Sequence, residues 1–268
     1  MPAVNVPQVM GILNVTPDSF SDGGHFFSMD SALKQARKML EEGAEIIDIG
    51  GESTRPGAQP VSVQQELDRV IPVVEKIRAE FPISISIDTS KAEVMREAIA
   101  VGADMINDVM ALRGESSLAA VAASKSLQVC LMHMQGEPRT MQNNPHYNNV
   151  VNDIKTFLLE RVQACLEAGI ASNRLLIDPG FGFGKTVEHN LRLIQRLEVL
   201  TELDYPVLVG VSRKSLIGHI LNKTVTERLY GGLALAVLAV SKGAKVIRTH
   251  DVAATVDALK MTHAVLQQ

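Results

Sequence analysis

Two aspartates in this 268-residue sequence stand at the ends of short apolar runs, where a buried strand would finish. Asp88 closes the run SISID and Asp178 closes LLID, while Asn14 and Asn107 end two other apolar runs. Carboxylates accept hydrogen bonds, whereas amides donate and accept, so this set suits a flat heterocycle with alternating donors and acceptors on its edge. Two other interpretations stay open: each aspartate could cap the helix that follows it, or the pair could serve as the acid and base of a glycosidase. A sugar site usually has aromatic platforms, and this chain has 4% aromatic residues and no Trp.

Five basic side chains follow other apolar runs and could bind an anion. Arg holds phosphate with two parallel hydrogen bonds, and Lys acts as a point charge. Arg248 and His250 are alternate residues of one strand end, so their side chains should point to the same side. Arg213 taken alone is better interpreted as a solvated loop charge. The five candidates are Arg55, Arg213, Lys214, Arg248 and His250.

Asn14 could also offer a neutral oxygen to Mg²⁺, which prefers few protein ligands together with phosphate oxygens of a substrate. An asparagine that closes the following turn is an equally good interpretation. Met132 is expected to pack in the core or line a pocket rather than bind a metal, because no second His or Cys cluster accompanies it. Phe181 and Phe183 lie on a glycine-rich loop, where they either pack locally or stack on a ligand ring.

These side chains can lie close together only in a fold that brings the C-terminal ends of several strands to the same side. Short runs rich in Val and Ile alternate with segments of helical period, and several runs are apolar throughout, as in parallel strands buried on both faces. Eight strands in this length give about 33 residues per unit, close to a βαβ repeat. The expected strands are 8–15, 45–50, 83–88, 105–109, 128–134, 175–178, 206–211 and 245–249, and the expected helices are 31–42, 64–80, 91–101, 149–168, 187–200, 226–242 and 252–266.

An internal repeat supports this arrangement. GAEIID (43–48), GADMIND (102–108) and GAKVIRTHD (243–251) each start with a glycine that suits the left-handed position after a helix. A strand follows, and a polar residue stands five positions after each glycine. Eight such units favour a single-domain (β/α)₈ barrel over residues 1–268, with its active site at the C-terminal ends of the strands. An open doubly wound sheet is disfavoured, because no GxGxxG follows the first strand.

Two segments are long for loops that follow strands. Residues 16–27 and 52–62 contain Gly, Ser and Asp, which suits mobile lids over a site, although plain surface loops are the alternative.

The composition argues against several classes of protein. With 26 basic and 30 acidic residues and a net charge of −4, the chain has no overall electrostatic reason to bind nucleic acid or a membrane surface. The longest apolar stretch, Leu233–Val240, is far short of the ~20 residues that cross a bilayer. The N-terminal residues lack the pattern of a secretory signal. Cys130 and Cys165 lie in apolar segments without metal-ligand spacing, so we expect reduced thiols and a cytoplasmic location.

Taken together, eight segments resemble the dihydropteroate synthase family from end to end of the chain. They are MGILNVTPDSFSDGG (10–24), DIGGESTRPGA (48–58), ISIDTSKAEVMREAI (85–99), INDV (106–109), LMHMQGEPRTMQ (131–142), LIDPGFGFGKTVEHN (176–190), GVSRKSLIG (210–218) and RTHDVAATVDAL (248–259). The resemblance implies a (β/α)₈ barrel, a homodimer and Mg²⁺ as cofactor. It also implies condensation of 6-hydroxymethyl-7,8-dihydropterin diphosphate with 4-aminobenzoate, which gives dihydropteroate and pyrophosphate in folate biosynthesis.

The resemblance also implies a role for each matching residue. Its implied catalytic residues are Asp88, Lys214 and Arg248, and its implied metal ligand is Asn14. The pterin diphosphate site would contain Thr54, Asp88, Asn107, Met132, Asp178, Lys214, Arg248 and His250. The 4-aminobenzoate site would contain Thr54, Arg55, Pro56, Phe183, Lys214 and Ser215. Two alternatives are a pterin-dependent methyltransferase barrel, which would lack the two long loops, and a non-catalytic pterin-binding paralogue, which would lack Asp88, Arg248 or the loop motifs.

Overall fold

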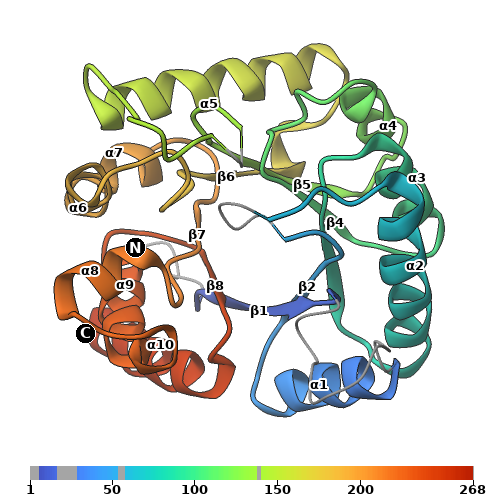
Figure 1. The fold of residues 1–268 in the computed structure, drawn as a ribbon, viewed down its shortest axis with the longest axis horizontal. Helices are drawn as coiled ribbons and strands as arrows, with labels where there is room; N and C mark the ends of the chain where they lie inside the picture. The colour runs from blue at the N-terminus through green and yellow to red at the C-terminus, as the bar shows by residue number, and fades with distance from the viewer. Residues whose placement is uncertain (1–5, 17–28, 54–57, 138–139, 268) are drawn as a thin grey trace.

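Eight parallel strands form the centre of the molecule, in a computed structural model that describes residues 6–16, 29–53, 58–137 and 140–267. The strands are β1 (Gln8–Asn14), β2 (Ile46–Gly50), β3 (Ser84–Asp88), β4 (Met105–Asp108), β5 (Gln128–Met132), β6 (Leu175–Asp178), β7 (Leu208–Val209) and β8 (Val246–Thr249). Their hydrogen-bonded order is β6-β5-β4-β3-β2-β1-β8-β7. A bridge between Ile177 on β6 and Val207, just before β7, connects the two outer members of this order. The expected (β/α)₈ barrel is confirmed (Figure 1).

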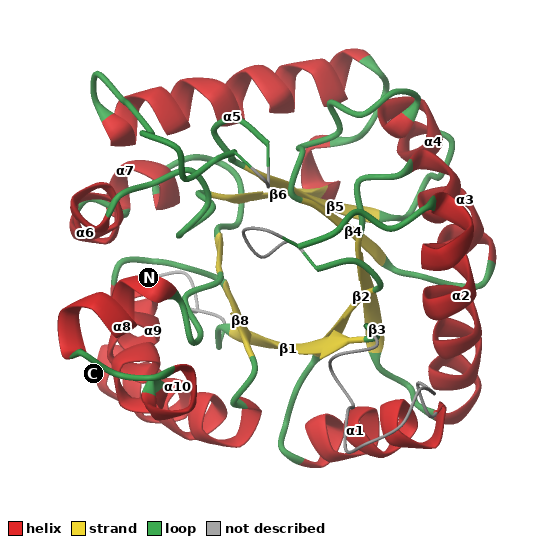
Figure 2. Cartoon of the chain, in the orientation of Figure 1, coloured by secondary structure: helices red, strands yellow, loops and turns green. Residues whose placement is uncertain are grey.

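Helices surround the strands on the outside (Figure 2). They are α1 (Met29–Glu41), α2 (Val63–Glu80), α3 (Ala92–Ala100), α4 (Ser117–Ala122), α5 (Val150–Glu167), α6 (Val187–Gln195), α7 (Glu198–Thr201), α8 (Ser215–Leu221), α9 (Leu229–Ser241) and α10 (Val252–Leu266), with 3₁₀ turns η2 (Ser172–Arg174) and η3 (Val225–Glu227). None of the helices in the described ranges is long and apolar enough to span a membrane.

The helices differ from the sequence prediction in three places. The helix expected over 187–200 is two helices, because the chain turns after Gln195 and so buries both Leu197 and Leu200 completely. Helices α4 and α8 were not expected, and each is only one or two turns long.

The side chains that point into the barrel form levels along its axis, as in other barrels of this type. The level nearest the N-terminal ends is apolar, with Met10, Ile46, Met105, Cys130, Leu176, Leu208 and Val246. Two residues further along each even-numbered strand, every inward side chain is polar. We call this set the polar level, and its members are Asp48, Asn107, Asp178 and Arg248.

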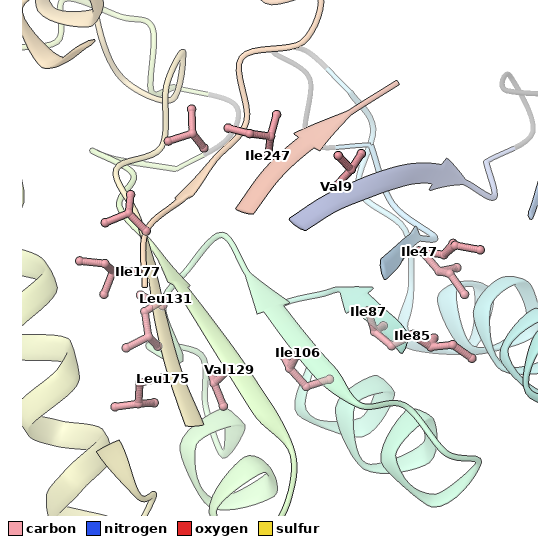
Figure 3. Close-up of a cluster of buried hydrophobic side chains, with 14 of the residues drawn as sticks. Val9, Ile47, Ile85, Ile87, Ile106, Val129, Leu131, Leu175, Ile177 and Ile247 are labelled. Carbon is pink, nitrogen blue, oxygen red and sulfur yellow. The ribbon is translucent and has the colours of Figure 1, made fainter. Parts of the chain in front are cut away.

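A second core lies between the strands and the helices. Side chains that alternate with the inward ones, such as Ile47, Ile106 and Ile247, belong to this core and are buried. Figure 3 shows part of it. Because both faces of each strand are covered, the positions of the inward side chains are strongly constrained.

The internal repeat has the predicted geometry. Gly43, Gly102 and Gly243 have φ of 95°, 101° and 98°, in the left-handed region that favours glycine. In each case the following alanine N–H donates back into the preceding helix, at 2.9 Å, 2.9 Å and 3.0 Å, which closes the helix end. The three repeats therefore start β2, β4 and β8 in the same way and bring their polar residues to one level.

Candidate active site

Asp48 is the shared acceptor of the polar level and is fully buried, with 0% of its surface exposed. Its Oδ2 accepts from Arg248 Nε at 2.6 Å and from Asn107 Nδ2 at 3.2 Å. Arg248 Nη2 also donates to Asp88 Oδ2 at 2.8 Å. The arginine is therefore held by two carboxylates, one inside the barrel and one at its rim.

Sequence reasoning did not assign Asp48 to the site. The repeat nevertheless contained the needed information, because it places Asp48 at the same position as Asn107 and Arg248. Two buried oxygens on this level, Asp48 Oδ1 and Asn107 Oδ1, have no hydrogen-bond partner among the described residues. Buried acceptors without a donor are costly, so these oxygens are available to a ligand or a water.

A pocket of about 320 Å³ opens to solvent above the polar level. Six of the residues expected to bind pterin diphosphate line it: Asp88, Asn107, Met132, Asp178, Lys214 and Arg248. The structure thus brings together side chains from β3, β4, β5, β6, β8 and the loop before α8.

Neither aspartate acts as a helix cap. Asp178 Oδ1 accepts from the backbone N–H of Gly180 at 2.7 Å, within its own loop, while Thr186 caps α6. Helix α3 starts after Lys91 and has no side-chain cap hydrogen bond. Both carboxylates therefore remain directed toward the pocket.

Burial shifts the pKa values of the pocket residues toward neutral pH. It raises the pKa of Asp88 to about 7, with Arg248 opposing the shift and Asp48 adding to it. It raises the pKa of Asp178 to about 6 against the hydrogen bond from its loop. Burial and the charge of Arg248 lower the pKa of Lys214 to about 8. Burial would lower the pKa of Arg248 as well, but its two carboxylate partners raise it, so the guanidinium stays charged.

The two phenylalanines of the loop after β6 have different surroundings. Phe181 is buried in the outer core. The ring of Phe183 lies beside the pocket, 4.0 Å from Nζ of Lys214, which is a cation–π contact. Phe181 also lines the pocket, so both phenylalanines border the site, one from the core and the other against the lysine.

His250 and Arg213 are both paired. The Ser212 hydroxyl accepts from the backbone N–H of His250 at 3.2 Å and lies 3.0 Å from His250 Nδ1. The hydroxyl has one hydrogen and two lone pairs, so it can pair with Nδ1 in either direction. Burial and Arg248 lower the pKa of His250 to about 3, so the ring is neutral. Arg213 Nε donates to Asp251 at 3.1 Å, so the interpretation as a solvated loop charge was wrong.

Some expected site residues cannot be placed in the pocket. Thr54, Arg55 and Pro56 lie outside the described residues, as do most of segment 16–27 and part of segment 52–62. Ser215 is the first residue of α8 and is exposed, directly after Lys214. The role assigned to each of them stays a prediction.

Asn14 ends β1 next to Gly50 and Asp88. A Cβ on Gly50 would lie 3.7 Å from Asn14 Oδ1 and 3.8 Å from Asp88 Oδ2, so both oxygens border the space that the glycine leaves. The described residues contain no group of three His, Cys, Asp or Glu that could enclose a metal ion. This donor set fits a hard cation such as Mg²⁺ that takes most of its ligands from water and a bound phosphate.

An ion cluster holds the base of the loop after β2. Lys91 Nζ pairs with the carboxylates of Glu52 and Glu66, and Glu66 is only 1% exposed. Glu52 Oε1 also accepts from the backbone N–H of Val61 at 3.0 Å. The cluster thereby fixes both ends of the segment that carries Thr54 and Arg55, and the sequence contained no pattern that predicted it.

Comparison with known proteins shows extensive similarity. Residues 10–250 match the family model described as "Pterin binding enzyme". The chain is 59% identical to the dihydropteroate synthase of Haemophilus influenzae over 261 residues, covering 97% of this chain and 94% of that protein. A structure of Xanthomonas albilineans dihydropteroate synthase with 4-aminobenzoic acid has a TM-score of 0.93 and 50% identity, covering 99% of this chain and 95% of that one. Another, in complex with 7,8-dihydropteroate, has a TM-score of 0.90, 47% identity and the same coverage.

Proposed function

This chain belongs to the dihydropteroate synthase family and is a transferase, and we propose that it joins 6-hydroxymethyl-7,8-dihydropterin diphosphate to 4-aminobenzoate. The products are 7,8-dihydropteroate and pyrophosphate. One observation carries the proposal for this site. Three members of the polar level line a single pocket together with Asp88 and Lys214. The two Xanthomonas albilineans structures, at 50% and 47% identity, hold 4-aminobenzoic acid and 7,8-dihydropteroate, which supports the same ligands here.

The pocket offers a pattern of hydrogen-bonding groups that matches a pterin edge. The carboxylates of Asp88 and Asp178 accept, and they face the ring N–H and amino groups of a pterin. The unpartnered Asn107 Oδ1 adds a third acceptor, and the Lys214 ammonium donates to the ring carbonyl and ring nitrogens. Met132 covers one side of the ring.

The reaction exchanges one bond at the exocyclic methylene carbon. The C–O bond to the diphosphate breaks, and the electron pair leaves with pyrophosphate. The carbon becomes electron-poor, and the negative charge of Asp88 stabilises it. The amine nitrogen then attacks this carbon and gives up a proton to the released pyrophosphate or to solvent, which restores a neutral secondary amine. No covalent bond to the protein forms.

The leaving pyrophosphate requires positive charge and hydrogen-bond donors. Arg248 stays charged, and His250 is proposed to contact the diphosphate through Nε2, since its Nδ1 contacts Ser212. Asn14 would hold Mg²⁺, which would supply additional positive charge for the departing diphosphate.

The aryl amine would enter beside Phe183 and Lys214, which form the wall of the pocket toward the loop after β6. Thr54, Arg55, Pro56 and Ser215 complete this half of the proposed site. Asp88, Lys214 and Arg248 are the proposed catalytic residues. Membership of the family removes the methyltransferase alternative, and the contact between Asp88 and Arg248 argues against a non-catalytic paralogue.

We extend the proposal to a homodimer in the cytoplasm. Helices α8, α9 and α10 lie next to one another and expose several large apolar side chains: Ile220, Leu221, Tyr230, Leu238, Met261 and Val265. Tyr230 is 80% exposed and Met261 is 67% exposed, and such a patch suits an interface. The buried free thiols of Cys130 and Cys165 support a reducing compartment. Light scattering of the wild-type chain and of Tyr230→Glu tests the dimer, which the substitution should weaken.

The decisive test of the reaction is pyrophosphate release from the pterin diphosphate, with and without 4-aminobenzoate. We expect release that requires the amine, with stoichiometric formation of dihydropteroate. Chelation with EDTA should stop the reaction, and added Mg²⁺ should restore it. Release that is independent of the amine would identify a hydrolase instead.

A further inference from the structure

Lys185 is a buried lysine that does not line the pocket, and only 4% of its surface is exposed. Its Nζ lies 2.8 Å from the carbonyl oxygen of Gly180, 3.0 Å from that of Phe183 and 3.0 Å from Nδ1 of His133. An ammonium has three hydrogens, and these three acceptors can satisfy all of them, while the carbonyl oxygen of His133 is a longer contact at 3.5 Å. Burial and the nearby Lys185 lower the pKa of His133 to about 2, so its ring is neutral and Nδ1 can accept.

The three acceptors belong to two loops that pack backbone against backbone. His133 follows β5, whereas Gly180 and Phe183 follow β6. A Cβ on Gly180 would overlap the carbonyl oxygen of His133, and a Cβ on Gly184 would lie 2.6 Å from the carbonyl oxygen of Gln135. The ammonium therefore cross-links two segments that have no room for other side chains.

The loop after β6 forms part of the pocket wall. Its first turn is tied to Asp178, through the Gly180 N–H, and the ring of Phe183 rests on Lys214. Further along, the Tyr147 hydroxyl donates to the carbonyl oxygen of Gly184 at 2.7 Å. Lys185 is thus one inner tie of this loop, the buried Asn190, which accepts from the Gly182 N–H at 2.8 Å, is another, and Tyr147 is an outer one.

We propose that Lys185 is a positioning residue for the aryl-amine half of the site: its ammonium holds the backbone of Phe183 so that the ring stays against Lys214. The effect on the amine rests on the proposed function, whereas the effect on the ring does not. A neutral lysine keeps two donors and leaves one acceptor unsatisfied, so loss of its proton weakens the tie without removing it.

The charged and titratable groups around Lys185 lie on four elements. They are Asp178 on β6, Lys214 before α8, His133 after β5 and His189 on α6. Burial lowers the pKa of Lys185 to about 7, with Asp178 opposing this shift and Lys214 adding to it. The tie is therefore expected to be strongest below neutral pH and to weaken as the pH rises.

The position of the ring can be measured directly, because the chain contains no Trp. Phe183→Trp places the only Trp of the chain beside Lys214, and it can be excited selectively over the three Tyr residues. With Lys185 present, we expect emission at a shorter wavelength at low pH and a shift to longer wavelength as the pH rises through about 7. In the Lys185→Met background we expect the longer wavelength at every pH. Tyr147→Phe is the matched control, since it loosens the same loop without removing the titrating group and should keep the pH transition.

Two results of this titration would overturn the proposal. One is a single-Trp chain whose emission does not change with pH, a measurement that needs no substitution at Lys185. The other is a transition that persists after Lys185→Met, which would assign it to Asp178, Lys214 or His189.

Steady-state kinetics test the consequence for the substrate. Lys185→Met should raise KM for 4-aminobenzoate by roughly tenfold or more, and it should change the Kd of a pterin without phosphate groups by less than about threefold. Equal losses for both ligands, or no change in KM, would overturn the proposed positioning of the amine. If no variant or wild-type chain formed dihydropteroate, the proposed function would fail, and the fluorescence would still decide whether Lys185 positions the ring.

Discussion

Replacing Asp48 by asparagine is expected to weaken the use of pterin diphosphate by about tenfold. Asp48 Oδ2 accepts from Arg248 Nε at 2.6 Å in a fully buried environment. Hydrogen bonds to charged groups contribute about 1.5–3 kcal/mol and neutral ones about 0.5–1.5 kcal/mol. Exchanging the carboxylate for an amide therefore removes roughly 1–2 kcal/mol from the positioning of Arg248. This loss corresponds to a decrease of roughly 5- to 30-fold in kcat/KM.

The same substitution should also move the pH profile. The negative charge of Asp48 contributes to the raised pKa of Asp88. Removing that charge lets the pKa of Asp88 fall, so the acidic limb of kcat/KM should move to lower pH. A loss of stability alone would not produce this shift.

The assay is steady-state pyrophosphate release at saturating 4-aminobenzoate and varied pterin diphosphate. Asp108→Asn is the matched control, because Asp108 is equally buried but accepts from the backbone N–H groups of Met110 and Leu112 outside the barrel interior. It should lower the melting temperature without changing the kinetics of the pterin substrate. A folded Asp48→Asn chain with unchanged kcat/KM would refute the role assigned to Asp48, and so would an equal kinetic loss in the Asp108 variant.

Other outcomes can be measured independently. Affinity for a pterin without phosphate groups should be highest between about pH 7 and 8, because Asp88 is protonated below that range and Lys214 loses its proton above it. Calorimetric titration at several pH values measures this affinity, and a flat profile would contradict the prediction. Lys91→Met should lower the free energy of unfolding in urea by about 3 kcal/mol, since it leaves a buried carboxylate without its cation, and a loss below about 1 kcal/mol would count against the ion cluster. Gly180→Ala should lower the free energy of unfolding by at least about 3 kcal/mol, because the added Cβ overlaps a backbone carbonyl. Gly169 also has a positive φ, but its added Cβ would have nothing within 4 Å, so Gly169→Ala should cost only about 1 kcal/mol. Equal losses in the two variants would refute the packing argument.

The strands and the barrel could be predicted because their pattern is strong. Runs buried on both faces are apolar throughout, and the repeated helix-ending glycine marks where three of the strands begin. The short helices α4 and α8 could not be predicted, since one or two turns are too short to show a helical period. The break between α6 and α7 depends on which leucines the neighbouring helices leave room to bury.

The site was predictable to a different extent. Asp88, Asn107, Asp178, Lys214 and Arg248 follow strands, and barrel topology alone brings such residues together. The position of a residue in the sequence does not show which other residues its side chain contacts. Other residues were therefore missed or misplaced: Asp48 and Lys185 had no assigned role, and Arg213 was interpreted as a solvated charge.

The three matching repeats have a consequence for how such a site can change. In each repeat, a glycine with φ near 100° ends a helix and thereby determines which residues of the next strand point into the barrel. The residue five positions after the glycine lies in the polar level. This inward orientation does not depend on the type of polar residue at the fifth position, since Asp48, Asn107 and Arg248 are an acid, an amide and a base. Ligand preference can therefore evolve at these three positions by single substitutions, while the backbone that presents them stays the same.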